Sequence, residues 1–330
     1  MYVNVDVRCF RLLVERYRPK RLSEIVGQEH VVKHLAEIVT RRAKVHMLLV
    51  GPPGCGKTST AYALANELGI PIHEYNASDE RGINVIRDKI KRVAFTLGEK
   101  IILLDEADNM TDDAQHALRR IMERAEKAGT IFILTANEEW RIIEPIKSRC
   151  AIFRFRKLTE EEVLRVLLNI LKGEGVDPKS IVASKEALMF LVKYVDGDLR
   201  QALNILETLI TSGKTLTVEN IRMLAPPKIA VRLLNMVLEG KVEEAIKTME
   251  DLYISNKLDS KETVEDFYKA IKSLDTNPIV KLKLFEKLAD VERNIKIGCN
   301  PVIQLASFLA SAYAYSVKAG VGGGAGEQPK

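Results

Sequence analysis

A glycine-rich segment between a predicted strand and a predicted helix constrains the fold of this 330-residue chain more than any other feature. The run VHMLLV at 45–50 is apolar, short and followed by glycine, as in a buried strand. Over 58–68, apolar residues recur at helical spacing. The segment between them, GPPGCGKT at 51–58, fits the pattern GxxxxGK followed by Ser or Thr. In this position the pattern predicts a phosphate-binding loop, and the alternative is an ordinary strand-to-helix turn.

The residue types of this loop suit a nucleoside triphosphate. Glycines let backbone N–H groups turn inward around phosphates, and the N-terminus of the following helix adds its positive end. We expect Lys57 to reach the outer phosphates and the Thr58 hydroxyl to ligate Mg²⁺. The predicted nucleotide-binding residues of the loop are Gly51, Pro52, Pro53, Gly54, Cys55, Gly56, Lys57, Thr58 and Ser59.

Two acidic residues follow a second apolar run. The run IILL at 101–104 leads into Asp105 and Glu106. Asp105 is placed to hold Mg²⁺ through water, and Glu106 to polarise a water for attack on the γ-phosphate. A solvated acidic strand end is the alternative. Beside a phosphate-binding loop, however, the pair predicts hydrolysis of ATP and not binding alone.

A third apolar run, at 130–134, is followed by Thr135, Ala136 and Asn137. Asn137 is predicted to lie at the same edge of the sheet as the first two motifs. It is suited to hydrogen-bond the attacking water or the γ-phosphate, and an asparagine in an ordinary turn is the alternative. Because strands and helices alternate along this part of the chain, the sequence predicts an α/β fold with a mostly parallel sheet covered on both faces.

The pattern changes after residue 155, where strand signals stop and helical periodicity begins. Ala-Pro-Pro at 225–227 predicts a linker, because proline cannot continue a helix. The glycine-rich end of the chain lacks an apolar period, which predicts disorder. The predicted organisation is an α/β domain at 1–157, a small helical domain at 158–225, a third, helical domain at 226–317 and a disordered glycine-rich tail at 318–330.

Composition narrows the class of protein. Hydrophobic residues make up 46% of the chain, which excludes wholesale disorder. Charges interrupt every apolar run before the roughly 18 residues that a membrane span needs, and the N-terminus lacks a secretory pattern, so we expect a soluble, cytoplasmic protein. The four cysteines are far apart and without nearby histidine, which predicts reduced thiols rather than a zinc site or disulfides. A net charge of +5 does not by itself indicate nucleic-acid binding.

Further motifs are distributed along most of the chain. They are VERYRP at 14–19, GQ at 27–28, NASDERGI at 76–83, DEAD at 105–108, SRC at 148–150 and GDLRQAL at 197–203. Together with the phosphate-binding loop they resemble the small subunit of replication factor C, the AAA+ clamp loader of archaea and eukaryotes, and most closely its archaeal form. The resemblance covers 12–317. It implies a P-loop AAA+ domain, a helical lid domain and a C-terminal helical collar domain for oligomerisation.

The resemblance assigns roles that spacing alone leaves open. It implies that Asn137 is the sensor-1 residue and that Arg200 is the sensor-2 arginine of the lid. It also implies that Arg149 is an arginine finger for the ATP of a neighbouring subunit, a task suited to a permanent cation. Taken alone, this arginine would be interpreted as half of a surface salt bridge. The residues implied to line the adenine pocket are Tyr17, Arg18, Pro19, Val26 and Gly27, and Val14 is a further predicted nucleotide-binding residue.

Two segments are candidates for contact with DNA. Residues 85–94 have helical periodicity, and residues 108–111 open a further predicted helix. In the family, the N-terminal ends of two such helices track the duplex backbone, and a solvated basic face is the alternative. The candidate phosphate contacts are Arg81, Arg87, Lys91 and Thr111. Between the segments, Phe95 and Leu97 either match the family's clamp-binding segment or belong to the core.

The sequence therefore predicts an ATP hydrolase subunit of the clamp loader of DNA replication, which opens the sliding clamp and places it on primer-template DNA. ATP and Mg²⁺ are the implied cofactors. The implied partners are the replication factor C large subunit, further small subunits of a hetero-pentamer, the clamp and DNA, with no membrane. One alternative is another AAA+ DNA-processing motor, for branch migration or helicase loading, which would lack the NASDERG and SRC pair. Another is a non-hydrolysing structural subunit, which Glu106, Asn137 and Arg200 argue against.

Overall fold

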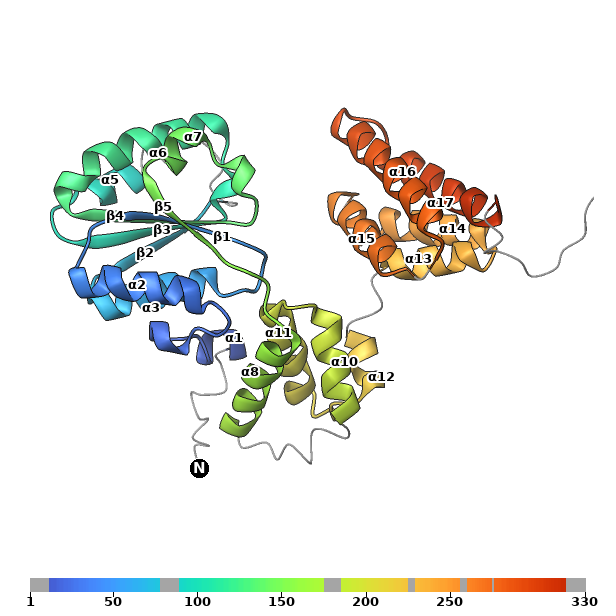
Figure 1. The fold of residues 1–330 in the computed structure, drawn as a ribbon, viewed down its shortest axis with the longest axis horizontal. Helices are drawn as coiled ribbons and strands as arrows, with labels where there is room; N and C mark the ends of the chain where they lie inside the picture. Colours follow the sequence, from blue (N-terminus) through green and yellow to red (C-terminus); the bar gives the residue numbers. More distant parts are fainter. Residues whose placement is uncertain are drawn as a thin grey trace, which may run out of the picture. The chain divides into compact units, whose positions relative to one another are not determined.

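The computed structural model describes residues 12–77, 89–174, 185–224, 229–255, 260–274 and 276–318. The chain forms two compact units, the first ending at Leu224 and the second beginning at Ala225 (Figure 1). The predicted linker at 225–227 and residues 319–330 of the predicted tail lie outside the described residues. Lys318, however, is the last residue of α17 (Pro301–Lys318) and does not belong to a tail.

A parallel sheet forms the centre of the first unit. Its strands are β1 (His46–Val50), β2 (Ile72–Asn76), β3 (Lys100–Asp105), β4 (Thr130–Ala136) and β5 (Cys150–Arg154). Within the described residues, the strand order is β2-β3-β4-β1-β5, and every pairing is parallel. The sheet confirms the predicted fold class. It also places β1 inside the sheet, between two strands that follow it much later in the chain.

Helices cover both faces of this sheet. On one face lie α2 (Glu29–Arg41) and α3 (Lys57–Leu68), and on the other lie α5 (Lys91–Phe95), α6 (Asp112–Ala125) and α7 (Glu144–Lys147) (Figure 1). Side chains alternate along β1, so that Met47 and Leu49 are buried toward α2 and α3, and Leu48 and Val50 toward α6. The short helices of this unit are α1 (Leu13–Arg16), η2 (Leu22–Glu24), η4 (Ala107–Asn109), η5 (Glu126–Ala128) and η6 (Glu139–Arg141).

The three apolar runs of the sequence are the three inner strands, β1, β3 and β4. The other two strands, β2 and β5, were not expected. They are the outermost strands of the sheet, and their side chains are half-buried or exposed, with no fully buried position to produce an apolar run. A search for apolar runs therefore finds the inner strands of the sheet and misses the two outermost strands.

Helices follow the sheet in the first unit, as predicted for the residues after 159. They are α8 (Glu160–Gly173), α10 (Lys185–Val195), α11 (Leu199–Thr211) and α12 (Val218–Leu224). A capping box starts α8: the Thr159 hydroxyl accepts a hydrogen bond from Glu162 N (3.3 Å), and the Glu162 carboxylate accepts one from Thr159 N (2.8 Å).

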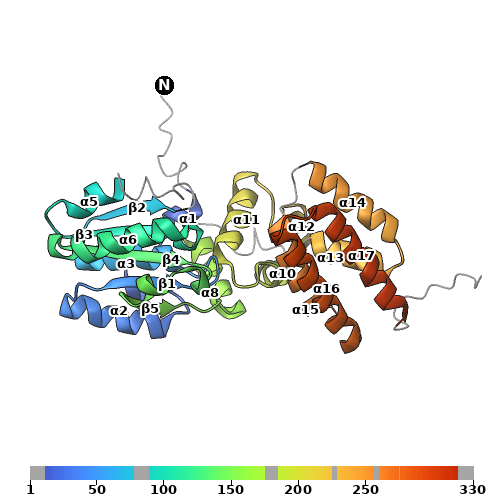
Figure 2. The same cartoon turned by 90° about the horizontal axis from the view of Figure 1, so that it is seen from above.

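The second unit is a helical bundle, as expected (Figure 2). Its helices are α13 (Ile229–Leu238), α14 (Val242–Ile254), α15 (Ser260–Ser273), α16 (Pro278–Lys296) and α17. Phe267 and Phe308 meet edge to face in its core, with ring centroids 4.9 Å apart. Across the described parts of both units, every helix is too short or too polar to cross a membrane.

Candidate nucleotide-binding site

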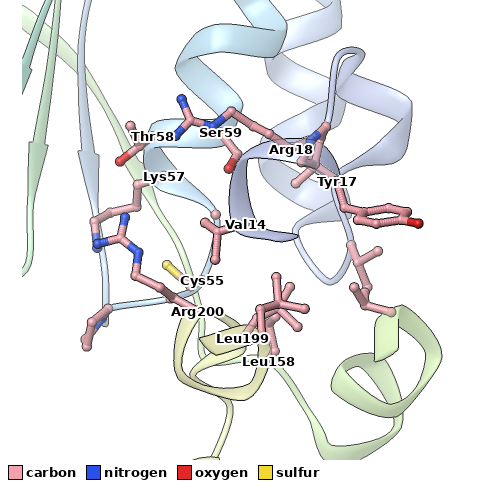
Figure 3. A pocket seen from close by; sticks show the side chains of 18 of the residues that line it. Val14, Tyr17, Arg18, Cys55, Lys57, Thr58, Ser59, Leu158, Leu199 and Arg200 are labelled. Carbon is pink, nitrogen blue, oxygen red and sulfur yellow. The ribbon is translucent and has the colours of Figure 1, made fainter. Parts of the chain in front are cut away.

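A cavity of about 300 Å³ lies where β1, β3 and β4 end, beside α1, α8 and α11 (Figure 3). The structure brings most of the predicted nucleotide-binding residues to this cavity. Those that line it are Val14, Tyr17, Arg18, Pro19, Val26, Pro53, Gly54, Cys55, Gly56, Lys57, Thr58, Ser59, Asp105, Glu106, Asn137 and Arg200. Three predicted residues, Gly27, Gly51 and Pro52, do not line it.

The loop before α3 depends on glycine for space. Gly54 has φ +69°, and a Cβ atom there would lie 2.0 Å from Oδ1 of Asp198. Asp198 caps the N-terminus of α11 by accepting a hydrogen bond from Gln201 N (3.0 Å). Glycine at position 54 therefore lets the phosphate-binding loop approach the lid helix that carries Arg200.

Lys57 lines the cavity and is held there by three hydrogen bonds. Its side-chain Nζ donates hydrogen bonds to the carbonyls of Gly51 (2.7 Å) and Pro52 (2.8 Å) and to Oδ1 of Asn137 (2.8 Å). Burial lowers the pKa of the Lys57 ammonium, while the carboxylates of Asp105 and Asp108 oppose that shift. Gly51 and Pro52 thus hold the lysine through their carbonyls.

Oxygen atoms gather next to this lysine. The Thr58 hydroxyl donates to Oδ1 of Asp105 (2.9 Å), and the Thr135 hydroxyl donates to the same oxygen (2.5 Å). A hydroxyl and a carboxylate are hard oxygen ligands of the kind that Mg²⁺ takes together with water and phosphate oxygens. The donor set at Thr58 and Asp105 therefore fits Mg²⁺, as expected from the sequence.

Glu106 is placed by backbone geometry that few residues adopt. Its φ is +56°, its backbone N–H donates to the Thr135 hydroxyl (3.0 Å), and its carboxylate accepts a hydrogen bond from Nδ2 of Asn109 (3.2 Å). Thr135 therefore links Asp105 and Glu106, a role that the sequence analysis missed. The available signal was a threonine at the end of the apolar run IFIL of β4, where the structure leaves it 1% exposed.

The lid supplies Arg200 and an apolar wall. Arg200 lies in the first turn of α11 and extends toward Lys57 (Figure 3). The wall residues were not named from the sequence, although those on α8 share one helical face, with spacings of three and four residues. Lining residues from this part of the chain are Leu158, Val166, Asn169, Ile170, Leu199 and Leu203.

At the predicted adenine end, α1 is tied to α8. The Tyr17 hydroxyl donates to Oε1 of Glu174 (2.7 Å), and Arg16 contacts both oxygens of the same carboxylate (2.6 and 2.7 Å). Burial and the Glu174 carboxylate raise the pKa of Tyr17 to about 12. A Cβ atom at Gly173 would lie 2.5 Å from the tyrosine oxygen, so glycine there permits this contact.

Gly27 has a different environment from the one that the resemblance implies. Its φ is +76°, and a Cβ atom there would lie 2.6 Å from Leu158 and 2.7 Å from Glu162. Next to it, Gln28 is fully buried and bonds both backbone groups of Arg156, at 2.7 and 3.1 Å. Gly27 therefore permits close packing on the segment that enters the lid.

Arg149 does not join the other predicted catalytic residues. It precedes β5, whose first residue, Cys150, pairs with the first residue of β1, His46. The phosphate-binding loop follows the last residue of β1, Val50. His46 and Val50 are about 13 Å apart at the rise of a parallel strand. Arg149 instead pairs with Glu123 and donates to the carbonyl of Pro145 (2.8 Å). It lines a second cavity, of about 220 Å³, at the opposite edge of the sheet.

Two of the four DNA candidates are described. Lys91 is exposed at the start of α5, and Thr111 is exposed immediately before α6, where its hydroxyl accepts a hydrogen bond from Ala114 N (3.3 Å). Arg81 and Arg87 lie outside the described residues.

The predicted clamp-binding loop is at the surface. Leu97 is 92% exposed and Phe95 is 38% exposed. The alternative in which these side chains belong to the core is therefore wrong.

Two parts of the chain match models of known protein families. Residues 47–158 match the family model "ATPase family associated with various cellular activities (AAA)", and residues 225–311 match "Replication factor C C-terminal domain". Among curated proteins, the replication factor C small subunit of Archaeoglobus fulgidus is 40% identical over 91% of this chain and 97% of its own length. That of Staphylothermus marinus is 41% identical over 91% of this chain and 93% of its own length.

Among solved structures, the chain is similar to RuvB of Thermotoga maritima, a Holliday junction branch migration motor. The TM-score is 0.56 with 19% sequence identity, covering 71% of this chain and 85% of that one. Similarity at this level of identity is a likeness of fold.

Proposed function

The chain belongs to the replication factor C small-subunit family, and we propose that it is an ATP-hydrolysing subunit of a clamp loader, which opens the sliding clamp and places it on primer-template DNA in the cytoplasm. The observation that carries the proposal is the polar cluster at one edge of the sheet. There Lys57 contacts Asn137, and Thr58 and Thr135 contact Asp105, all beside the cavity.

In this proposal, the triphosphate of ATP takes the place of the loop's own carbonyls around Lys57. The ammonium leaves the carbonyls of Gly51 and Pro52 for the outer phosphates, and the N–H groups at the start of α3 face the same charge. The apolar wall of α8 and α11, with Val14 and Tyr17 opposite, encloses the base. Thr58 and Asp105 would hold Mg²⁺, which would neutralise charge on the phosphates.

Hydrolysis needs a water aligned with the γ-phosphate. Glu106 accepts the proton of this water as it attacks, and Asn137 orients the water or the γ-phosphate. Arg200 adds a positive charge from the lid. Arg149 lies too far from its own phosphate-binding loop to take part there, which supports its assignment to the ATP of a neighbouring subunit.

We propose the remaining parts of the molecule as contact regions. Residues 158–225 act as the lid, and the unit beyond them as the collar that joins this chain to the large subunit and other small subunits. Lys91 and Thr111, with Arg81 and Arg87, contact DNA phosphates, and exposed Phe95 and Leu97 contact the clamp.

The proposal is tested by steady-state ATP hydrolysis of the complex that contains this chain, with clamp, primed DNA, both or neither. Clamp and primed DNA together should raise the rate, and the same complex with Glu106→Gln in this chain is the control. Greater stimulation by a four-way junction would favour a branch-migration motor. Binding of ATP without hydrolysis in every combination would favour a structural subunit.

DNA contact has a separate test in the salt dependence of binding. Each lost phosphate contact should reduce the slope of log affinity against log salt by about one unit, so Lys91→Ala should flatten the slope by that amount. Lys33, exposed on α2 at the opposite face of the sheet, provides the matched control. Equal slopes for Lys91→Ala, Lys33→Ala and the unaltered chain would show that Lys91 belongs to a solvated basic face and does not contact DNA.

A further inference from the structure

Asp108 is a nearly buried carboxylate, 7% exposed, in the short helix η4. Its Oδ2 atom accepts hydrogen bonds from two successive backbone N–H groups, those of Asn137 and Glu138, each at 3.1 Å. These donors follow β4, whereas Asp108 follows β3. One carboxylate therefore joins the turns after two neighbouring strands.

The other oxygen of Asp108 lies in an unusual environment. Oδ1 is buried, and within the described residues it has no hydrogen-bond partner. A buried carboxylate with one unpaired oxygen is costly, and most buried polar atoms in proteins are paired. This cost indicates that the two backbone N–H groups need a strong hydrogen-bond acceptor. A charged carboxylate oxygen is a stronger acceptor than a neutral oxygen.

The turns that Asp108 joins carry the two groups proposed to act on the attacking water. Glu106 is two residues before Asp108 and immediately before η4, and Asn137 supplies one of the two bonded N–H groups. The side chain of Asn137 faces the site, since its Oδ1 accepts a hydrogen bond from Lys57 Nζ (2.8 Å). Asp108 itself does not line the cavity.

We propose that Asp108 is a positioning residue for ATP hydrolysis, which fixes Asn137 relative to Glu106 by bridging the turns after β3 and β4. The inference rests on the proposed function, because it acts through groups assigned there. Loss of the bridge leaves the phosphate-binding loop intact but lets Asn137 move relative to the water. Misplacement of a catalytic group by about 1 Å costs roughly 100-fold in rate.

The test compares binding and turnover in the full complex. Asp108→Asn, which keeps the shape and removes the charge, should lower kcat by about 10- to 100-fold and leave the ATP dissociation constant within about twofold. Asp113→Asn removes a charge at an exposed position of α6 and is the matched control, with kcat unchanged.

A double-mutant cycle separates positioning from a general effect. In an Asn137→Ala background, Asp108→Asn should cause no further loss of kcat, because the group that it positions is already absent. The same fractional loss in both backgrounds would overturn the proposal. The proposal would also be overturned if neither Asp108→Asn nor Asp108→Ser unfolded cooperatively, since Asp108 would then be required for folding. Failure of the proposed function is distinguishable, because the unaltered complex would then not hydrolyse ATP.

Discussion

The two edges of the sheet carry different chemistry. Where β1, β3 and β4 end, Lys57 and Asp105 are fixed by several hydrogen bonds beside a cavity. Where β1 and β5 begin, Arg149 and Glu123 form an ion pair that is about one-third exposed. The first edge is organised in advance for a charged ligand. The second holds a cation in an exchangeable contact, since exposed ion pairs contribute at most about 1 kcal/mol.

This difference supports a division of labour between neighbouring copies of the fold. If Arg149 acts as the proposed arginine finger, a chain whose phosphate pocket and finger lie at opposite edges cannot complete its own site and would complete that of a neighbouring subunit.

Removing Arg149 should affect hydrolysis without affecting the pocket of the same chain. Arginine fingers contribute about 10³- to 10⁵-fold in rate, so Arg149→Ala should lose most hydrolysis at the shared interface. Nucleotide affinity, measured by fluorescence titration, should be retained, because the arginine lies at the other edge.

Mixing variants tests whether the arginine acts between subunits. Arg149→Ala and Lys57→Ala chains, each nearly inactive alone, should partly recover activity together, because some interfaces pair an intact pocket with an intact arginine. Mixtures shown by native mass spectrometry to contain both chains, yet without recovery, would defeat the assignment.

Two changes within the first edge should separate binding from chemistry. Glu106→Gln should retain ATP binding and lower hydrolysis by about 10²- to 10⁴-fold, because it removes the base. Lys57→Ala should lose productive ATP binding, because it removes the phosphate cation. Equal nucleotide affinity in Lys57→Ala and the unaltered chain, measured by titration, would contradict the phosphate assignment.

Thr130 lies at the start of β4 and Thr135 near its end, so substituting each threonine compares the two edges of the sheet within one strand. Thr135→Val removes the donor to Asp105 and the acceptor for Glu106 N, and should lower kcat about tenfold. Thr130, equally buried at the start of β4, donates to the Ala94 carbonyl (2.8 Å), and Thr130→Val should leave kcat unchanged. Both variants should lower the free energy of unfolding by about 1–3 kcal/mol, measured with urea. A similar loss of kcat in both would remove the distinction between the edges.

The smallest effect on stability is expected from breaking the ion pair between Arg149 and Glu123. Glu123→Ala should change the free energy of unfolding by less than about 1 kcal/mol, because the pair is partly solvated. Hydrolysis should not fall, since the variant leaves Arg149 in place. A loss of hydrolysis as large as that of Arg149→Ala would show that the pair itself is needed.

Much of this site could be predicted from the sequence because its motifs are local. Strand, loop and helix are contiguous at 45–68, and the acidic and sensor motifs each follow an apolar run. Contacts between distant segments could not be predicted in this way. The Arg149 ion pair depends on how α6 packs, and the bridge from Asp108 to Asn137 depends on two loops folding together. Gly27 shows the same limit, since its neighbours come from the entry to the lid.

The interior position of β1 has a consequence for the order of events during synthesis. Its two partners, β4 and β5, are made later, and β5 follows about 100 residues after β1, roughly 5 to 20 s at ordinary rates of translation. Until β4 is made, the strand that leads into the phosphate-binding loop has no partner in the sheet, and until β5 is made it has only one. The apolar strand is therefore made before its partners, and we expect chaperones that shield apolar segments to engage the nascent chain during this interval.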